Sequence, residues 1–167
     1  MATTRRRNFF RRRGGGGKPE YGWTACDPTG FSVNAATTAV VILAGSDWAR
    51  GSGVSQSATL QRIRGGFSWQ GTASAITRAY IARYDEGETV DSAALITTYF
   101  NEDILWTWTR SSAANADATP QPSEYVPIDI KVRRKLTLDS TIQLVFTGSA
   151  ATAAFVVPVI RALVRFS

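Results

Sequence analysis

The stretch VPIDIKVRRKL, residues 126–136, decides the fold class because its apolar and charged residues alternate. Residues 128, 130 and 132 are β-branched and apolar, whereas residues 129, 131 and 133 are charged. A period of two is typical of a β-strand with one face in a core and the other in solvent. The stretch therefore predicts a half-buried strand, and with it a β-rich protein.

Runs of similar character lie on both sides of this stretch. We expect strands over the ranges 37–45, 58–71, 75–85, 104–110, 126–136, 140–148 and 153–167. Gly65 and Gly66 predict a bulge or a sharp bend in the second of these ranges. Pro158 predicts that the last range is an edge strand, contains a bulge, or breaks into two strands. Residues 88–100 form the best helix candidate, and residues 111–123 read as a polar loop.

These elements predict an all-β protein, and we expect a single eight-stranded antiparallel jelly-roll sandwich. An immunoglobulin-like sandwich is less favoured, because the single Cys26 cannot supply its paired cysteines. We divide the chain into a disordered Arg-rich arm (1–18), a linker and first strand region (19–36) and a shell domain (37–167). The most apolar window, near the C-terminus, contains Pro158, Arg161 and Arg165, so we expect no membrane-spanning segment.

The positive charge is concentrated at the N-terminus. The chain has 19 Lys and Arg against 13 Asp and Glu, and seven of the 19 lie in the first 18 residues, which contain no acid. The rest of the chain therefore carries 12 basic and 13 acidic residues. A charge block of this kind is usually an unfolded interaction tail, because its charges repel one another and little apolar surface offsets the entropy of ordering.

Arginine pairs bidentately with phosphate, so we assign nucleic-acid binding to this arm. The residues concerned are Arg5, Arg6, Arg7, Arg11, Arg12, Arg13 and Lys18. Phe9 and Phe10 could stack on unpaired bases. A nuclear-import signal, a solubilising tail and a mitochondrial transit peptide are alternatives. The four glycines before Lys18 fit a hinge better than a phosphate-binding loop, since Pro19 follows the lysine.

The remaining residues offer little chemistry. The chain has no histidine, which excludes a His-containing zinc site and any Ser-His-Asp arrangement. The acidic residues of YDEGETVD (84–91) could hold calcium or act as an acid-base pair, but a solvated turn is the simpler interpretation. Trp106 and Trp108 share one face of a strand and are expected in the core or a subunit interface. We expect no enzyme activity, cofactor or metal.

A second basic patch is possible in the opening stretch. It comprises Lys131, Arg133, Arg134 and Lys135. Alternation holds up to Arg133, and Arg134 then breaks the phase. The patch would face phosphate, or else form solvated surface or intersubunit ion pairs.

Five stretches in order carry a resemblance to a known family. RIRGGFSW, AYIARYD, DILWTW, VPIDIKVRRKL and IQLVF look like the small capsid proteins of circovirus-like single-stranded DNA viruses. The resemblance covers roughly residues 37–147, and the body is shorter than a circovirus coat protein. It implies a single jelly roll whose copies, about 60, close into an icosahedral shell around the genomic nucleic acid, single-stranded DNA. The virion, with the host nucleus during assembly, is the implied location.

Other functions remain open at this point. The chain could be a non-viral nucleic-acid-binding β-barrel module with a basic tail, which would stay monomeric or dimeric. It could also be a minor or decoration protein of a virion. An enzyme that uses carboxylates alone is a further alternative.

Overall fold

The computed structural model describes residues 5–9, 20–36, 38–47, 58–71, 74–85, 103–112, 122–150 and 153–166. The described residues are almost entirely β-structure, which confirms the all-β prediction. The strands are β1 (Arg5–Phe9), β2 (Glu20–Asp27), β3 (Phe31–Val33), β4 (Thr38–Leu43), β5 (Ala58–Gly71), β6 (Ile76–Tyr84), β7 (Ile104–Ser111), β8 (Glu124–Leu136), β9 (Thr141–Gly148) and β10 (Ala154–Phe166). The helical element among them is the short 3-10 turn η1 (Gly45–Asp47).

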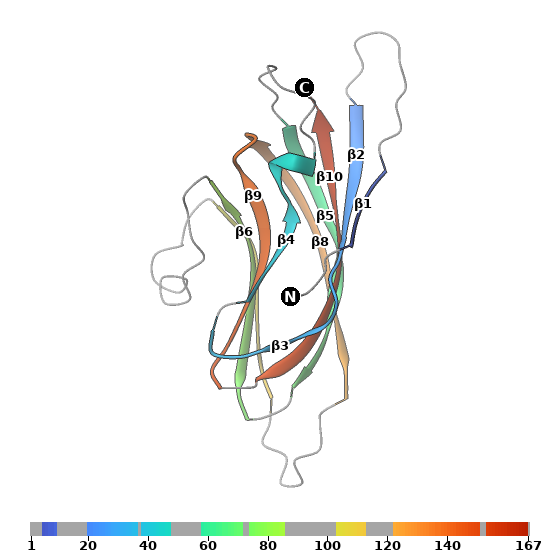
Figure 1. Ribbon diagram of the computed structural model, residues 1–167. Coiled ribbons are helices and arrows are strands. Elements are labelled where there is room, and N and C mark those ends of the chain that lie inside the picture. Colours follow the sequence, from blue (N-terminus) through green and yellow to red (C-terminus); the bar gives the residue numbers. More distant parts are fainter. Residues whose placement is uncertain are drawn as a thin grey trace.

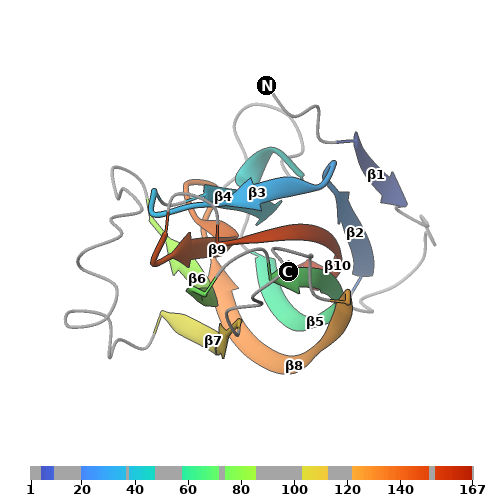
Figure 2. The ribbon, with the colours of Figure 1, turned by 90° about the horizontal axis from the view of Figure 1, so that it is seen from below.

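The strands form two antiparallel sheets that face one another (Figure 1). In the first sheet the order is β1-β2-β10-β5-β8, and β3 also pairs with β10. In the second sheet the order is β4-β9-β6-β7. Viewed along the strands, the long strands of the first sheet curve around the common interior (Figure 2). Strands distant in sequence are therefore neighbours in both sheets.

The core lies between the two sheets and consists of alternate residues from each strand. Phe67 of β5 lies at its centre, with its ring edge-on to Trp108 at 5.2 Å and to Phe146 at 5.0 Å. Trp106 and Trp108 pack against this cluster from the same face of β7, as the sequence predicted. In β8 the inward residues Val126, Ile128 and Val132 are buried, so the opening stretch forms the half-buried strand expected of it. Burial of about 30 apolar side chains supplies the main stabilising term.

The irregularity in β5 precedes the two glycines. The register of β5 against β8 shifts between Leu60 and Arg62. Before this shift the even-numbered residues of β5 point into the core, and after it the odd-numbered residues do. Leu60 and Ile63 consequently share the buried face, although strict alternation would put residues three positions apart on opposite faces. Gly65 and Gly66 keep regular partners in β8 and β10, so the prediction of a bulge at the glycines is wrong.

Of the three alternatives for Pro158, only the edge fits, and only locally, because β10 is continuous and its register shift against β5 falls between Leu163 and Val164. On one side β10 pairs with β5 along its whole length. On the other side residues 160–166 pair with β2 and residues 154–156 pair with β3. Pro158 lies opposite the interruption between β2 and β3, where one neighbour is missing. A residue without an N–H is tolerated there, because no ladder hydrogen bond is lost on that side.

The N-terminal boundaries differ from those expected. Arg5–Phe9 were assigned to a disordered arm but form strand β1, which pairs antiparallel with β2. The edge of β2 offers backbone N–H and C=O groups, and pairing satisfies them regardless of side-chain charge. The region 19–36, expected to hold a linker and a first strand, contains β2 and β3 of the first sheet. The other residues of the arm and the helix candidate 88–100 lie outside the described residues.

The described residues contain ten strands where the sequence predicted eight. The two additional strands are β1 and the short β3. Among the described residues, no helix is long and apolar enough to cross a membrane.

Candidate nucleic-acid interface

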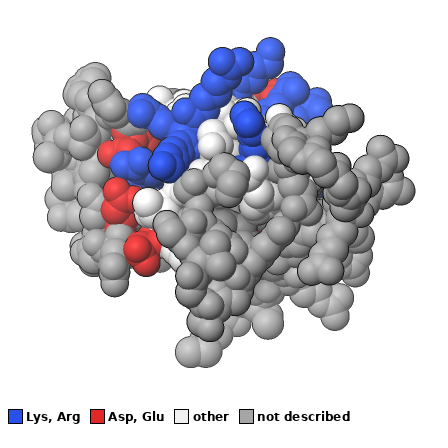
Figure 3. Space-filling view, turned by 90° about the horizontal axis from the view of Figure 1, so that it is seen from above, with Lys and Arg blue, Asp and Glu red and all other residues white. Residues whose placement is uncertain are grey.

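Seven cationic side chains occupy outward positions of the first sheet. We call this surface the basic face; its residues are Arg62, Arg64, Lys131, Arg133, Lys135, Arg161 and Arg165. They lie on β5, β8 and β10, where the inward positions are apolar and the outward positions are open to solvent. In Figure 3 the Lys and Arg side chains gather along one side of the molecule. Asp129 is the acid among them, so the face carries a strong net positive charge.

The strand register brings these charges into rows across the sheet. Arg165 is the partner of Thr59, which pairs with Lys135 on its other side. In the next row Arg62 is the partner of Lys131. A third row brings together Arg161, Arg64 and Asp129. Neighbouring strands lie about 4.8 Å apart, so the cations are close enough to act on one polyanion.

Asp129 organises the arginines on β5. Its carboxylate accepts two hydrogen bonds from Arg62, from Nε and from Nη2, each at 2.6 Å. Arg64 Nε lies 3.6 Å from the same carboxylate. The hydrogen bonds from Arg62 hold the pKa of Asp129 below its ordinary value, and the same contact raises the pKa of Arg62. The aspartate thus stays ionised and fixes the orientation of one guanidinium.

Arg64 and Arg161 form a pair of like charges. They are direct cross-strand partners on the exposed face of β5 and β10. Like charges directly opposite one another destabilise a sheet. Asp129 lies beside Arg64, and among the side chains that the structure describes, which do not include that of Asp27, no acid pairs with Arg161. An anion placed between the two guanidiniums would remove the repulsion, so the pair is suited to phosphate.

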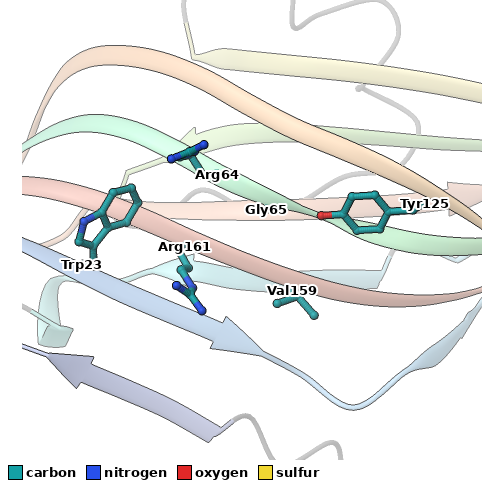
Figure 4. Close-up of a pocket in the computed structure, with 6 residues that line it drawn as sticks. All are labelled: Trp23, Arg64, Gly65, Tyr125, Val159 and Arg161. Carbon is teal, nitrogen blue, oxygen red and sulfur yellow. The ribbon is translucent and has the colours of Figure 1, made fainter.

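The like-charged pair adjoins a hollow in the basic face. It has a volume of about 550 Å³ and is lined by Trp23, Arg64, Gly65, Tyr125, Val159 and Arg161. Figure 4 shows Trp23 and Tyr125 at opposite ends, with Arg64 and Arg161 between them. Trp23 and Tyr125 are 36% and 58% exposed, so their rings are available to a ligand.

Gly65 lines the hollow, and Gly66 follows it in β5. Gly65 has a φ of +134°, and a Cβ there would lie 2.0 Å from the carbonyl oxygen of Val159. At Gly66 a Cβ would lie 2.7 Å from the phenol oxygen of Tyr125. The missing side chains let β10 approach closely and let the ring of Tyr125 lie over the backbone. This is the structural role of the Gly-Gly pair.

The structure separates the residues of the second basic patch. Lys131, Arg133 and Lys135 are exposed on the basic face. Arg134 occupies an inward position of β8, is half-buried and pairs in register with the buried Leu60. The phase change suspected at Arg134 does not occur, because the alternation of β8 continues to Leu136. The patch therefore comprises three of the four residues named.

The arm residues are only partly placed. The backbones of Arg5, Arg6 and Arg7 pair with β2 at the edge of the first sheet opposite to β8. The two basic segments found in the sequence thus lie at the two edges of one sheet. The remaining arm residues lie outside the described residues; they are Arg11, Arg12, Arg13 and Lys18.

The residues that join these edges were missed by sequence reasoning. Two of them, Arg62 and Arg64, lie on β5, and the other two, Arg161 and Arg165, lie on β10. These two strands are far apart in the sequence. The residues of each pair are separated by an even number of positions, as residues on one face of a strand are. This spacing was the only sign in the sequence that each pair shares a face. Only the pairing of β5 with β10 brings the two pairs together.

The other candidate chemistries gain no support. Asp85 accepts a hydrogen bond from Ser140 Oγ at 2.8 Å and pairs with Arg83, which fits a structured turn. Cys26 is buried, and its Sγ lies 3.1 Å from the carbonyl oxygen of Val41. Within the described part of the chain, no three His, Cys, Asp or Glu residues are grouped as metal ligands. Glu86, Glu88 and Asp91 lie outside it.

The geometry thus provides a charged surface for polyanions, with aromatic rings beside paired arginines. The arrangement has the two components used for unpaired nucleic acid, cations for phosphate and rings for bases. Neither the protein-family models nor the curated proteins with which the chain was compared gave a match.

Proposed function

We propose that the chain is a capsid protein whose copies assemble into an icosahedral shell and package nucleic acid. The observation that carries the proposal is the nested pairing of its long strands. In chain order these are β2 with its continuation β3, then β4, β5, β6, β7, β8, β9 and β10. The first pairs with the eighth, the second with the seventh, the third with the sixth and the fourth with the fifth.

Nested pairs of this kind support a jelly-roll sandwich. A long antiparallel hairpin that is rolled up produces two sheets in which β10 also meets β5 and β9 also meets β6, as observed. Double-sheet jelly rolls with eight strands occur in viral capsid proteins, but also in lectins and cupins. The fold therefore agrees with the family resemblance without deciding the function alone.

Charge distribution supports the nucleic-acid role. The body beyond residue 18 is nearly neutral in total, yet seven of its cations share one face, on which Asp129 is the acid among the described side chains. If about 60 copies assemble, the seven charges of each N-terminal segment alone bring roughly 420 positive charges to the genome. The basic face would add to this number. The resemblance to capsid proteins of circovirus-like viruses implies that the genome is single-stranded DNA. It also implies that the protein is located in the virion and, during assembly, in the host nucleus.

Assembly is tested with the purified full-length protein. Sedimentation and negative-stain imaging are expected to find closed particles of tens of subunits. The ultraviolet absorbance of these particles, compared with that of protein alone, is expected to reveal enclosed nucleic acid. Nuclease treatment before and after particle disruption distinguishes enclosed from surface-bound polymer. A monomer or dimer that persists at high concentration with nucleic acid present would contradict the proposal.

A non-viral nucleic-acid-binding module is the second candidate. The observation that favours it is the hollow with exposed Trp23 and Tyr125, since binding modules for single strands place aromatic rings on an open β-surface. Such a protein would bind oligonucleotides without forming particles. The imaging experiment separates the two candidates directly.

A further inference from the structure

We propose that the hollow between Trp23 and Tyr125 binds one nucleotide unit of an unpaired nucleic-acid strand, with phosphate held by Arg64 and Arg161. The inference rests on the nucleic-acid role proposed above, and it assigns part of the binding to the folded sheet. The sequence pointed to the N-terminal segment and to β8, whereas the two described arginines that line this hollow belong to β5 and β10.

The phosphate end of the site follows from the two arginines. They are adjacent across β5 and β10, are both exposed, and both line the hollow. A phosphate between them accepts hydrogen bonds from both guanidiniums and relieves their mutual repulsion. Asp129 lies beside Arg64 on the side remote from Arg161, so its carboxylate does not fill the space between the two guanidiniums.

The base end follows from Trp23. In β2 the outward residues are Tyr21, Trp23 and Ala25, and Ala25 is the register partner of Arg161. Trp23 therefore lies diagonally beside Arg161, at a distance that aromatic and long side chains can span. The small side chain of Ala25 leaves this diagonal open. A base stacked on the exposed indole would carry its phosphate towards the arginine pair.

The size and lining of the hollow fit a flat ligand. A volume of about 550 Å³ lies within the range of small-molecule sites. Gly65 lines the hollow with backbone alone, so no side chain at this position obstructs the ligand. Val159 and Tyr125 provide an apolar rim at the far end, where the sugar or a second base would rest. A highly sulfated polysaccharide would satisfy the arginines but has no flat π-face to stack on Trp23, so the aromatic residue favours nucleic acid.

The test compares base-bearing and abasic strands on the full-length protein. Fluorescence anisotropy measures the affinity for labelled twelve-nucleotide oligothymidine, the equivalent RNA, an abasic strand of equal charge, and heparin. Trp23→Ala is expected to lower the affinity for a base-bearing strand about five- to hundredfold and to leave abasic-strand binding unchanged. Tyr21→Ala, which removes an exposed ring from the same strand outside the hollow, is the matched control and is expected to leave both affinities unchanged.

The arginines are tested through the salt dependence. The double variant Arg64→Ala/Arg161→Ala is expected to reduce the slope of log K against log salt by about 0.7, since the pair holds one phosphate and each neutralised phosphate on a single strand contributes about 0.7. Arg78→Ala removes a charge from the second sheet and is expected to leave the slope unchanged. These residues are exposed or half-exposed, so thermal melting should confirm that the variants fold.

The outcomes separate the site from the broader function. If oligothymidine and RNA both lose affinity in Trp23→Ala, the site reads the chemistry they share; if one does, that polymer is its ligand. If heparin loses as much as the oligonucleotides, or if Trp23→Ala matches the wild type, the site as proposed does not exist. Should the wild type bind oligonucleotides while both variants behave normally, this inference fails and the packaging role survives. Failure of every protein to bind would overturn both.

Discussion

The outer faces of the two sheets are used differently, although both inner faces obey the same alternation. On the first sheet the outward positions of β5, β8 and β10 carry seven cations and remain open to solvent. On the second sheet the outward residues Tyr80, Ala82, Tyr84 and Val145 form a separate buried cluster. Alternation determines which residues point away from the core. The chemistry of those residues then decides whether the outer face is a charged surface suited to a polyanion or an apolar surface that is buried.

This contrast predicts opposite consequences for substitutions on the two outer faces. Replacing Tyr80 with Ala is expected to lower the free energy of unfolding by about 3 kcal/mol, because the ring is 6% exposed and leaves a cavity. Val159→Ala on the first sheet is expected to cost less than about 0.5 kcal/mol, since the side chain is 47% exposed. Guanidinium denaturation measures both values. Equal losses would remove the distinction between the faces.

At Gly65 the first sheet depends on a backbone geometry that other residues rarely adopt. Gly65→Ala is expected to destabilise the protein by about 1–3 kcal/mol, because the residue has a positive φ and its Cβ would meet the carbonyl of Val159. Ser68→Ala, on the same strand, is the control and is expected to cost less than about 0.5 kcal/mol. Thermal unfolding compares them. An unaffected Gly65→Ala would show that the close approach of β10 is not required.

Adjacent arginines on β8 test whether inward and outward positions have separate roles. Arg133→Ala is expected to reduce the salt slope of oligonucleotide binding by about 0.7 and to leave stability unchanged. Arg134→Ala removes the same charge from an inward, half-buried position and is expected to cost about 1 kcal/mol of stability without changing the slope. Binding titrations at several salt concentrations, paired with denaturation, would expose a reversal of these roles.

The smallest expected effect concerns Asp129 and pH. Because Arg62 depresses the pKa of Asp129 in the folded state, the stabilising contact is complete above the unfolded value, about pH 4. It is lost as the pH falls through the folded value. Loss of the negative charge of Asp129 also frees Arg62 and Arg64 for other anions. Asp129→Asn, which removes this charge at every pH, is therefore expected to strengthen oligonucleotide binding at neutral pH with little change in stability.

The control for this prediction is Glu124→Gln. It frees Arg110, whose Nη2 lies 2.9 Å from Glu124, and Arg110 belongs to the second sheet. Its binding affinity is expected to match that of the wild type. If Asp129→Asn weakens binding, the aspartate orients the arginines more than it competes for them.

Much of the strand content was predictable from local patterns, because alternation is a local property. Residues 126–136 and 140–148 gave strands with the expected buried faces. The parity change after Leu60 was not predictable, since a bulge depends on the two neighbouring strands rather than on β5 alone. The pairing of β1 escaped for the same reason: a charged segment reads as a tail until the free edge of β2 is known.

The sequence by itself determined that the protein is all-β, that its N-terminal segment is strongly basic, and that histidine chemistry is absent, since composition and period-two patterning need no knowledge of distant residues. Only the tertiary structure decided where the charges of the body lie. Pairing β10 with β5 sets Arg161 beside Arg64, which is far from it in the sequence, and pairing β10 with β2 places Trp23 diagonally next to Arg161. A binding surface built across strands exists only after long-range hydrogen bonding has fixed their order and register.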